Sequence, residues 1–367
     1  MARVLAQIRK ELTQLRRDKL TLALALALPA MLLLLLSTAT SLSVRDIPVV
    51  VQDLDETPLS RKYIEQVAGS LAFRIHVLPA GMSANRALDQ NLARAAMIIP
   101  PQFHRRVGRG EGAELQWLID ATDTNTANVM RGKVAAITDA FNRSLHPASP
   151  SAIRAEIRYW FNPGREDLKY FGPGVLAFGM AIFPTILAAL ALSREGELKT
   201  ILQVYVSSVS AAEYLLGKVI AYTLVAILEW MIGMAILFGV FGLRLAGEPS
   251  TLVMATVLYL LCSTCWGAMV GAGIPNQAAA IQAAQLGSLL TSFLFAGYIF
   301  PVQNIPQPLR YLSMFVPMRY YLEVLRDAFL RGGGWPRLWH VPIALGLLAS
   351  FFFWRAWSSL REMQVKA

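Results

Sequence analysis

The chain has 367 residues, 55% of them apolar and only 16% charged, whereas soluble domains average about 45–50% apolar and about 25% charged residues. The net charge of +10 would suit a nucleic-acid-binding protein, but residues 43–173 are nearly balanced, with sixteen basic and fourteen acidic residues. Because much of the remaining excess flanks apolar runs of about 20 residues, the length that crosses a hydrocarbon core of roughly 30 Å, the composition predicts a membrane protein and excludes nucleic acid as a partner.

Residues 1–19 carry six basic and two acidic residues and are predicted to form an amphipathic helix on the inner membrane surface, in contact with lipid. Its apolar positions recur at helical spacing and are Val4, Leu5, Ile8, Leu12 and Leu15. The first apolar run follows at 20–42. Small residues at 37–41 would also suit the cleavage site of a signal peptide, but the run exceeds the usual 7–15 apolar residues, so we expect a retained transmembrane helix.

Residues 43–173 are hydrophilic, and strand-like runs alternate in them with helix-like ones, which predicts an α/β domain large enough to bury its own core. The predicted strands are Ile47–Val51, Phe73–Leu78, Ala95–Ile99 and Leu115–Ile119. The predicted helices are Pro58–Gly69, Ser83–Ala93 and Thr124–Leu145. The turns at 53–60 and 120–127 precede two of these helices, where Asp or Thr would act as N-caps.

Five more apolar runs lie in residues 174–354, which makes six in total. They are Gly174–Leu192, Val219–Phe241, Leu252–Ile274, Ala278–Phe300 and Leu338–Trp354. The predicted fold is a polytopic α-helical membrane protein with six transmembrane helices and an inserted extracytoplasmic α/β domain. An even number of spans puts both termini on one side. The basic N-terminus and the basic tail 355–367 indicate the cytoplasm, although 301–337 carries five arginines and would lie outside.

Two small-residue motifs lie inside the apolar runs. Cys262 and Cys265 have no second Cys or His pair with metal-ligand spacing, so we interpret them as packing residues. Gly267 and Gly271 form a G-x-x-x-G that favours close helix packing, either within the bundle or at a dimer seam.

Sequence motifs for catalysis or nucleotide binding are missing from this chain. It contains no G-x-x-x-x-G-K-[ST], no H-E-x-x-H and no G-x-S-x-G, and its four histidines are scattered: His76, His104, His146 and His340. We therefore expect no metal or cofactor bound by this chain, no enzymatic activity of its own, and energy supplied by a partner.

The stretch 193–217, between the second and third spans, is predicted to face the cytoplasm. Its charges lie at the start and are followed by an apolar stripe of Leu198, Ile201, Leu202 and Tyr205. A short amphipathic helix here would insert into a groove on a cytoplasmic partner. A solvated loop that only joins two helices is the alternative, and both interpretations stay open on the residues alone.

This stretch resembles the coupling region of ABC-2 type export permeases. The matching positions are Glu195, Glu197, Thr200, Gln203, Val206, Ser207, Ser210, Gly217 and Lys218. The sequence departs from the pattern at Lys199, which replaces a Gly, at Leu202, which replaces a Glu, and at Ser208, which replaces a Pro.

A second resemblance lies in residues 297–332. Pro301, Pro306 and Pro308 would break a helix, and 309–315 and 318–330 read as two short helices separated by Pro317. This pattern predicts an interfacial hairpin at 301–337 that seals the outer mouth of the bundle, with a plain loop as the alternative. The order of its residues resembles the C-terminal block of ABC-2 permeases, and the positions that match are Gly297, Pro301, Ile305, Pro306, Leu309, Leu312, Ser313, Pro317, Arg326 and Gly332.

Glu229 lies near the centre of the third span, where a carboxylate is costly and is a functional candidate by default. It would contact a cationic substrate or brace the transport pathway. The alternative is a structural Glu that is protonated or hydrogen-bonded to another helix, and both interpretations stay open.

The resemblance implies a permease subunit of an ATP-binding cassette exporter in the bacterial inner membrane. ATP and Mg would be bound by a separate ATP-binding subunit, and a second permease chain, identical or a close homologue, would complete the pathway. The outward domain suggests a periplasmic adaptor and an outer-membrane channel, as in tripartite efflux, and family substrates include drugs, lipids, polysaccharides and ions. The implied ATPase-coupling residues are Glu195, Glu197, Leu198, Thr200, Leu202 and Gln203. The implied hairpin residues are Pro301, Pro306, Pro317 and Arg326.

Two other classes of protein are the alternatives to an exporter. A membrane-anchored sensor or scaffold would use the outer α/β domain to bind a ligand or partner, but it would need neither the coupling stretch nor the proline-broken block. An intramembrane enzyme would need a paired catalytic constellation, which the sequence does not offer.

Overall fold

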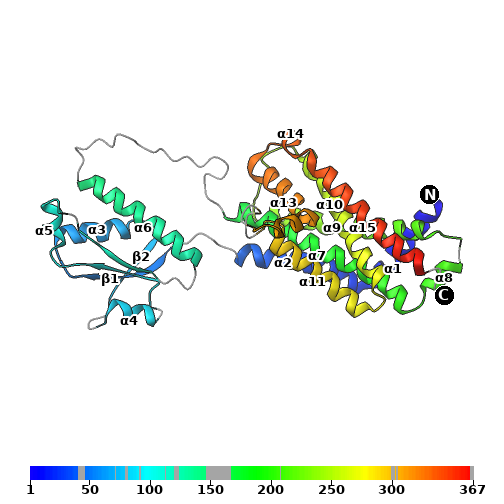
Figure 1. Ribbon diagram of the computed structural model, residues 1–367, viewed down its shortest axis with the longest axis horizontal. Helices are drawn as coiled ribbons and strands as arrows, with labels where there is room; N and C mark the ends of the chain where they lie inside the picture. Colours follow the sequence, from blue (N-terminus) through cyan, green and yellow to red (C-terminus); the bar gives the residue numbers. More distant parts are fainter. Residues whose placement is uncertain are drawn as a thin grey trace. The chain divides into compact units, whose positions relative to one another are not determined.

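The computed structural model describes residues 1–39, 46–70, 72–78, 82–90, 92–111, 113–119, 124–145, 167–206, 208–298, 302 and 305–363. These residues form two compact units (Figure 1). One consists of Met1–Ser41 and Tyr159–Ala367, and the other of Leu42–Arg158. Pro301 and the turn at 120–123 lie outside the described residues.

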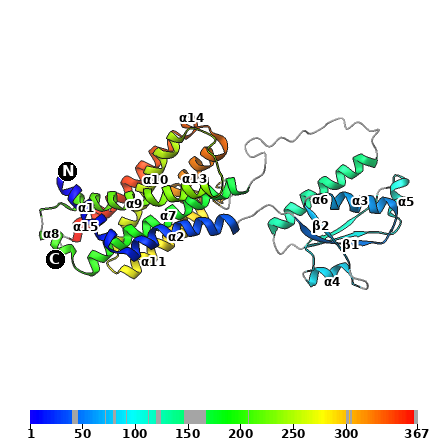
Figure 2. The same ribbon diagram turned by 180° about the vertical axis from the view of Figure 1, so that it is seen from behind.

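The first unit is a bundle of helices (Figure 2). Its elements are α1 (Ala2–Arg17), α2 (Lys19–Ala39), α7 (Asp167–Glu197), α8 (Ile201–Val206), α9 (Ala211–Gly239), α10 (Pro249–Gly273), α11 (Gln277–Phe295), α12 (Leu309–Leu312), α13 (Pro317–Arg326), α14 (Trp335–Leu338) and α15 (His340–Met363). Within the described part of the chain, six of these helices are long and apolar enough to cross a membrane, and they are α2, α7, α9, α10, α11 and α15. The prediction of six apolar spans is confirmed.

Local sequence sets where the spans begin. Ser210 caps α9 through a capping box with Glu213, and the side chain of Asn276 accepts a hydrogen bond from Ala279 N at the start of α11. Pro249 occupies the first turn of α10, where the missing N–H leaves no helical hydrogen bond unmade. α7 itself extends through Glu197, so the charges predicted to lie in a loop belong to the last turns of a helix.

The G-x-x-x-G motif on α10 packs against α7 of the same chain. A Cβ on Gly267 would collide with the backbone of Thr185, and a Cβ on Gly271 would collide with the backbone of Ala189. Because only glycine lets two backbones approach so closely, the motif serves packing inside the bundle, as one of the two interpretations predicted. Cys262 and Cys265 are buried beside it and act as packing residues.

The proline-rich C-terminal segment forms short helices, and its second helix is part of the core. The chain runs through α12 and a 3-10 turn to Phe315, and α13 begins at Pro317. Tyr321 on α13 is fully buried and stacks on Tyr259 with ring centroids 4.3 Å apart. Its hydroxyl accepts a hydrogen bond from Trp230 Nε1 at 2.8 Å. The predicted pair of short helices is confirmed, and the plain-loop alternative is wrong because α13 packs on α7 and α10.

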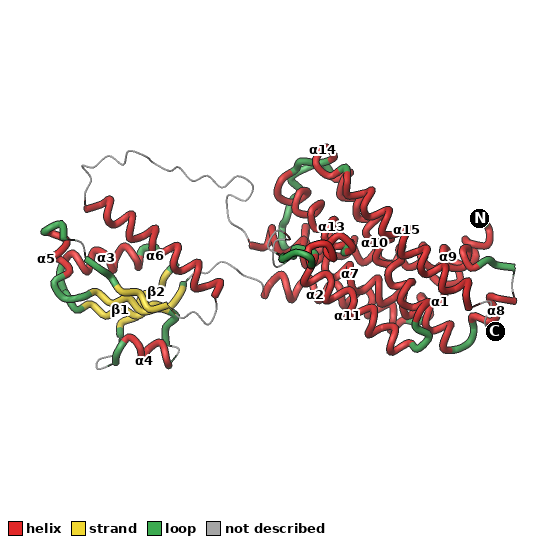
Figure 3. Tube along the Cα trace, in the orientation of Figure 1, coloured by secondary structure: helices red, strands yellow, loops and turns green. Residues whose placement is uncertain are grey.

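The second unit is built around a four-stranded sheet (Figure 3). Its strands are β1 (Ile47–Asp53), β2 (Phe73–Val77), β3 (Ala95–Ile99) and β4 (Gln116–Ile119), in the order β2-β1-β3-β4. The first three run parallel, and β4 pairs antiparallel with β3. Its helices are α3 (Pro58–Ala68), α4 (Ala84–Asp89), α5 (Phe103–Gly108) and α6 (Thr124–Leu145).

Side chains from both faces of the sheet form the core of this unit. Tyr63 on α3 and Phe141 on α6 pack edge to face at 5.0 Å over one face. On the other face, Ala84 and Ala87 of α4 pack against Val50. The four predicted strands and the helix at 124–145 are confirmed; α4 ends earlier than predicted, and the helix α5 was not predicted.

Candidate functional site

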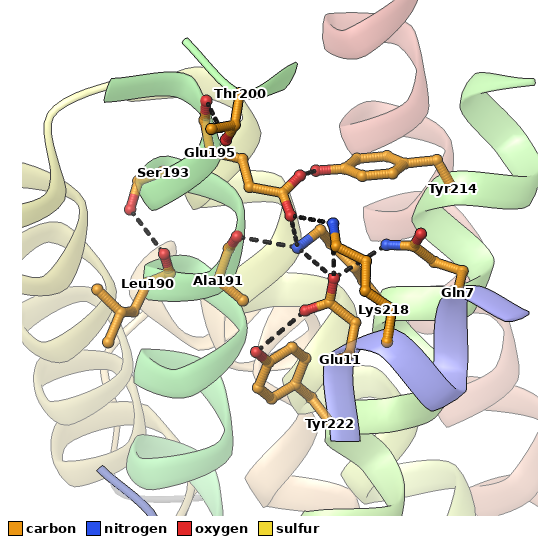
Figure 4. A network of polar contacts seen from close by, with 11 residues as sticks. Gln7, Glu11, Leu190, Ala191, Ser193, Glu195, Thr200, Tyr214, Lys218 and Tyr222 are labelled. Atoms are coloured by element: carbon orange, nitrogen blue, oxygen red, sulfur yellow. Dashed lines mark hydrogen bonds and ion pairs between the residues drawn. The ribbon is translucent and has the colours of Figure 1, made fainter. Parts of the chain in front are cut away.

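Three helices of the bundle meet at a buried cluster of charged side chains, shown in Figure 4. Glu11 comes from α1, Glu195 from the last turns of α7 and Lys218 from the second turn of α9. Glu11 is 2% exposed and Lys218 is 1% exposed, and Glu195 is also buried. Because an isolated ion is strongly disfavoured away from water, a lysine this deeply buried requires partners.

Lys218 uses all of its hydrogen-bonding capacity within this cluster. Its Nζ lies 2.9 Å from Glu11 Oε1 and 3.1 Å from Glu195 Oε1. It also donates to the carbonyl oxygen of Ala191 at 3.1 Å. An ammonium group has three donors, and here each has an acceptor.

Further donors surround the two carboxylates. They are Gln7, Lys10, Tyr214 and Tyr222. Lys10 Nζ lies 2.8 Å from Glu195 Oε1, and the Tyr222 hydroxyl donates to Glu11 Oε2 at 3.3 Å. Two ammonium groups thus face two carboxylates, so the cluster is balanced in charge and well supplied with hydrogen bonds. Breaking one partner of such a buried pair is far more costly than its net contribution to stability.

Gly217 lets α1 approach α9 closely enough to form this cluster. A Cβ at Gly217 would lie 2.6 Å from Gln7 Cβ and 3.4 Å from Val4 O. Arg3 at the start of α1 also donates to the carbonyl oxygen of Ser208 at 2.6 Å. The Gly-Lys pair at 217–218 therefore has two physical roles, since the glycine admits the helix and the lysine binds its carboxylate.

The amphipathic helix predicted at the N-terminus is α1, and its buried face lies against the bundle. Leu15 packs in a cluster with Leu187 of α7 and Val225 of α9, and Glu11 lies one turn away on the same face. Sequence reasoning missed Glu11. The available signal was an acidic residue on the apolar stripe of an otherwise basic helix, combined with a lysine at the start of an apolar span.

The six predicted coupling residues occupy different environments. Glu195 is bound within the chain by the cluster, and Glu197 accepts a hydrogen bond from Gln277 N at the start of α11. The Thr200 hydroxyl donates to Glu195 O at 3.4 Å. The side chain of Gln203, on α8, lies outside the described residues.

The apolar members of the predicted coupling stretch are exposed. Leu198 is 60% exposed, Leu202 is 49% exposed and Val206 is 90% exposed, and we call these three residues the coupling ridge. Ile201 and Val204 of α8 pack inward against the cluster that contains Leu192 and Tyr214. The stretch therefore includes a short amphipathic helix, and the solvated-loop alternative is wrong.

Three of the predicted hairpin residues are described, and of these Arg326 makes the contacts that hold the segment around α13. Pro317 begins α13, and Pro306 is exposed. Arg326 ends the helix, where its NH2 group donates to the Tyr170 hydroxyl at 2.7 Å and to Gly297 O at 2.9 Å. Its guanidinium also lies 4.5 Å from the centre of the Tyr170 ring. Arg326 therefore joins the hairpin to the beginning of α7 and the end of α11.

Glu229 is buried in α9, three turns beyond Lys218, and does not belong to the charged cluster. Neither of its carboxylate oxygens has a hydrogen-bond partner among the described residues. Because a buried carboxyl group without a partner is costly, Glu229 stays a candidate functional residue of this span.

The fold and the site define a multi-pass membrane protein with an exposed apolar ridge anchored by a buried ion cluster. Comparison with known proteins gives the class: the sequence matches the ABC-2 family transporter protein over residues 19–358. This chain belongs to the ABC-2 transporter family.

Three Escherichia coli K12 proteins are similar to this chain. It is 26% identical over 257 residues to YbhS, a probable multidrug ABC transporter permease. The matched residues are 69% of this chain and 66% of YbhS, so the match spans just under two thirds of that relative. It is 25% identical over 342 residues to YbhR, also a probable multidrug ABC transporter permease, covering 90% and 92%. It is 23% identical over 357 residues to YhhJ, an inner membrane transport permease, covering 94% and 93%. These relatives are transport subunits rather than enzymes.

Proposed function

We propose that this chain is the permease subunit of an ATP-driven exporter that moves its substrate out of the cytoplasm or the inner membrane. ATP and Mg are bound by a separate ATP-binding subunit, and this chain supplies the pathway. Membership of the ABC-2 family and the permease names of three relatives support the role, and the name of one of them, the inner membrane transport permease YhhJ, supports the location in the inner membrane.

The observation that carries the proposal is the coupling ridge. Leu198, Leu202 and Val206 expose apolar surface next to the charged end of α7, although α8 buries its other face in the bundle. An apolar helix face of this kind fits a groove on a partner protein. The ridge is therefore the contact through which the ATP-binding subunit acts on the permease.

The buried cluster connects the coupling ridge to the spans α7 and α9. Glu195 lies three residues before Leu198, and it is bound to Lys218 on α9 and, through Lys218, to Glu11 on α1. A displacement of the ridge by the partner is then transmitted to α7 and α9 together rather than lost in a loose connection. The coupling itself is a difference in the binding free energy of the partner for two states of the bundle.

The remaining parts of the proposal concern the whole assembly. Two permease chains, identical or closely related, form the pathway, and both termini face the cytoplasm. The unit Leu42–Arg158 is an extracytoplasmic α/β domain that docks a periplasmic adaptor leading to an outer-membrane channel. Drug-like compounds are the favoured substrates because two relatives are named as probable multidrug permeases.

A photocrosslinking residue at Leu202 tests the central claim. The photoreactive amino acid p-benzoylphenylalanine replaces Leu202 of the full chain, which is expressed in the organism that it comes from. After illumination, the covalent adducts are identified by mass spectrometry. We expect an adduct with a protein that contains a P-loop. The matched control is the same substitution at Leu54, a leucine of similar exposure (50%) on the other unit, which should give no such adduct. Adducts of Leu202 with lipid alone, in cells that contain the assembled transporter, would contradict the proposal.

A further inference from the structure

A cavity of about 340 Å³ lies inside the helical unit, and neither the ion cluster nor the coupling ridge contributes to it. It is lined by α7, α10, α11, α15 and the segment 312–318, and it is partly open, since Leu312, Phe315 and Phe351 in its lining are exposed. One face of each helix points into it: Tyr259, Ser263 and Trp266 recur on α10 at helical spacing, and Ser288 and Ser292 recur on α11. A volume of this size accommodates a drug-sized molecule.

The wall of the cavity is aromatic and uncharged. Trp266 and Phe352 meet edge to face with ring centroids 5.2 Å apart, and Phe295, Phe315 and Phe351 complete the lining. None of the described residues that line it is Asp, Glu, Lys or Arg. Because no cation lines it, burying an anion in such a place is strongly disfavoured, and the cavity excludes anionic ligands.

Two buried hydroxyl groups in this wall make no hydrogen bond of normal geometry with the part of the chain that the structure describes. Ser263 is 3% exposed and Ser288 is 5% exposed, and the Oγ atom of each lacks a hydrogen bond among the described residues. Their neighbours differ, because Thr185 donates to Ala181 O at 2.8 Å and Thr291 donates to Gly287 O at 2.6 Å. Buried hydroxyls are normally paired, so these two are available donors for a bound molecule.

We propose that this cavity binds an uncharged lipophilic molecule whose hydrogen-bond acceptor, a carbonyl or ether oxygen, is held by Ser263 and Ser288. The proposal rests on the proposed function, for which it names the class of substrate. A hydrocarbon chain of a lipid offers no acceptor to the two hydroxyls, and water alone would leave the aromatic wall unfavourably hydrated. A neutral molecule that combines aromatic rings with an acceptor satisfies both parts of the wall.

Benzophenone is a suitable probe because it is neutral, aromatic and carries one carbonyl acceptor, and light attaches it to the C–H bonds around it. The full chain in lipid nanodiscs is illuminated with benzophenone, and the labelled peptides are mapped by mass spectrometry. We expect labelling to concentrate on cavity residues such as Ser292, Phe295 and Met318. The exposed residues Leu286 and Leu290 on α11 give the background from lipid-dissolved probe. The matched anion 4-benzoylbenzoate should label the background sites only, because no cation in the lining would pair with its carboxylate.

Three variants make the test specific. Ser263→Ala and Ser288→Ala should each reduce cavity labelling about fivefold at limiting probe, as expected when one hydrogen bond to the ligand is lost. Ser292→Phe should abolish it by filling the volume. Ser350→Ala is the control, since Ser350 is exposed on α15 and its hydroxyl already donates to Gly346 O, and it should leave labelling unchanged. Thermal unfolding midpoints within about 2 °C of the parent establish that each variant is folded.

The outcomes separate this proposal from the function on which it rests. Labelling that stays at background, that ignores all three cavity variants or that is equal for the anion overturns the cavity as a site for neutral ligands, even where the adduct of Leu202 with a P-loop protein is present. Cavity labelling that responds to the variants supports the site. If it does so while no P-loop adduct forms, the binding site stands and the exporter role falls.

Discussion

Lys218 is a buried ion in an otherwise apolar helix, and its environment explains how the chain tolerates it. Two carboxylates from other helices and one carbonyl oxygen surround its ammonium group. Such a cluster adds little net stability compared with apolar residues of the same volume, but it specifies one arrangement of α1, α7 and α9, because only that arrangement satisfies every charge.

Replacing Lys218 should therefore strongly lower the stability of the helical unit. Lys218→Met removes the buried cation between Glu11 and Glu195 and should destabilise the helical unit by about 3–5 kcal/mol, as measured from denaturant unfolding followed by tryptophan fluorescence. Lys19→Met removes an exposed lysine at the start of α2 and should change stability by less than about 0.5 kcal/mol. Adding Glu11→Gln to Lys218→Met should recover part of the loss, and a double variant as unstable as the sum of both singles would contradict a direct pair.

Asp18 gives the same region a dependence on acid. The N–H of Thr21 at the start of α2 and the guanidinium of Arg194 on α7 lower the pKa of Asp18 below its ordinary value of 3.8, although burial opposes this. A carboxylate with a depressed pKa contributes stability above its unfolded pKa, and that stability is lost as pH falls through its folded pKa.

We expect the thermal midpoint of the parent protein to fall between about pH 5 and pH 3 more steeply than that of Asp18→Asn, because the variant has no charge to lose. The measurement is a series of melting curves at constant ionic strength. Parallel curves for the two proteins would show that the Asp18 charge contributes nothing to folding.

At the scale of elements, the contact between α1 and α9 decides whether the coupling ridge is firmly held. Gly217 sits directly under Gln7, where a methyl group would overlap its Cβ. Gly217 thus permits the close packing of α1 on α9, and the adjacent Lys218 forms the ion pair with Glu11 of α1. Both contacts are lost if α1 separates from α9.

Gly217→Ala should displace α1 and destabilise the unit by about 1–3 kcal/mol, as overpacking does elsewhere. Limited proteolysis with trypsin measures the displacement, and we expect faster cleavage at the basic residues of α1, such as Arg9. The control is Gly239→Ala at the end of α9, where an added Cβ meets nothing within 4 Å, and cleavage should match the parent. Unchanged cleavage in Gly217→Ala would mean that α1 does not depend on this crossing.

At the scale of the whole molecule, the chain consists of two units with separate cores. The cluster around Tyr63, Met97 and Phe141 belongs to Leu42–Arg158, and the cluster around Tyr259, Tyr321 and Leu345 belongs to the helical bundle. Two independent cores suit two different surroundings, and the proposed topology places the sheet unit outside the cytoplasm and the coupling ridge inside it.

Single cysteines test that topology. In a background without Cys262 and Cys265, Lys62→Cys on α3 and Lys199→Cys beside the coupling ridge both replace exposed lysines. In cells with a permeabilised outer membrane, a membrane-impermeant maleimide should label the cysteine at 62 and spare the one at 199 until the inner membrane is opened. Labelling of both, or of 199 alone, in cells with an intact inner membrane would overturn the six-span topology.

The sequence by itself determined the elements of this protein, because their signals are local. Apolar runs of membrane length gave the six candidate spans, alternation gave the four strands, and the prolines at 306 and 317 gave the short helices of the C-terminal block. The α5 helix was missed because its six residues are too short to show a helical period, and α4 ended early for the same reason.

Only the tertiary structure decided which residues meet. Glu11 and Lys218 are more than 200 positions apart, and no local pattern relates them, yet packing of α1 over Gly217 brings their charged atoms to 2.9 Å. The tertiary structure also buries Glu195, which the sequence had predicted to contact the ATP-binding subunit. The coupling ridge is then the exposed part of the stretch. The hydroxyls of Ser263 and Ser288 became notable only once folding buried them in the wall of an aromatic cavity, where neither has a hydrogen-bond partner among the described residues. A polar group that loses its water on burial needs a new partner, and local sequence does not show whether one is present.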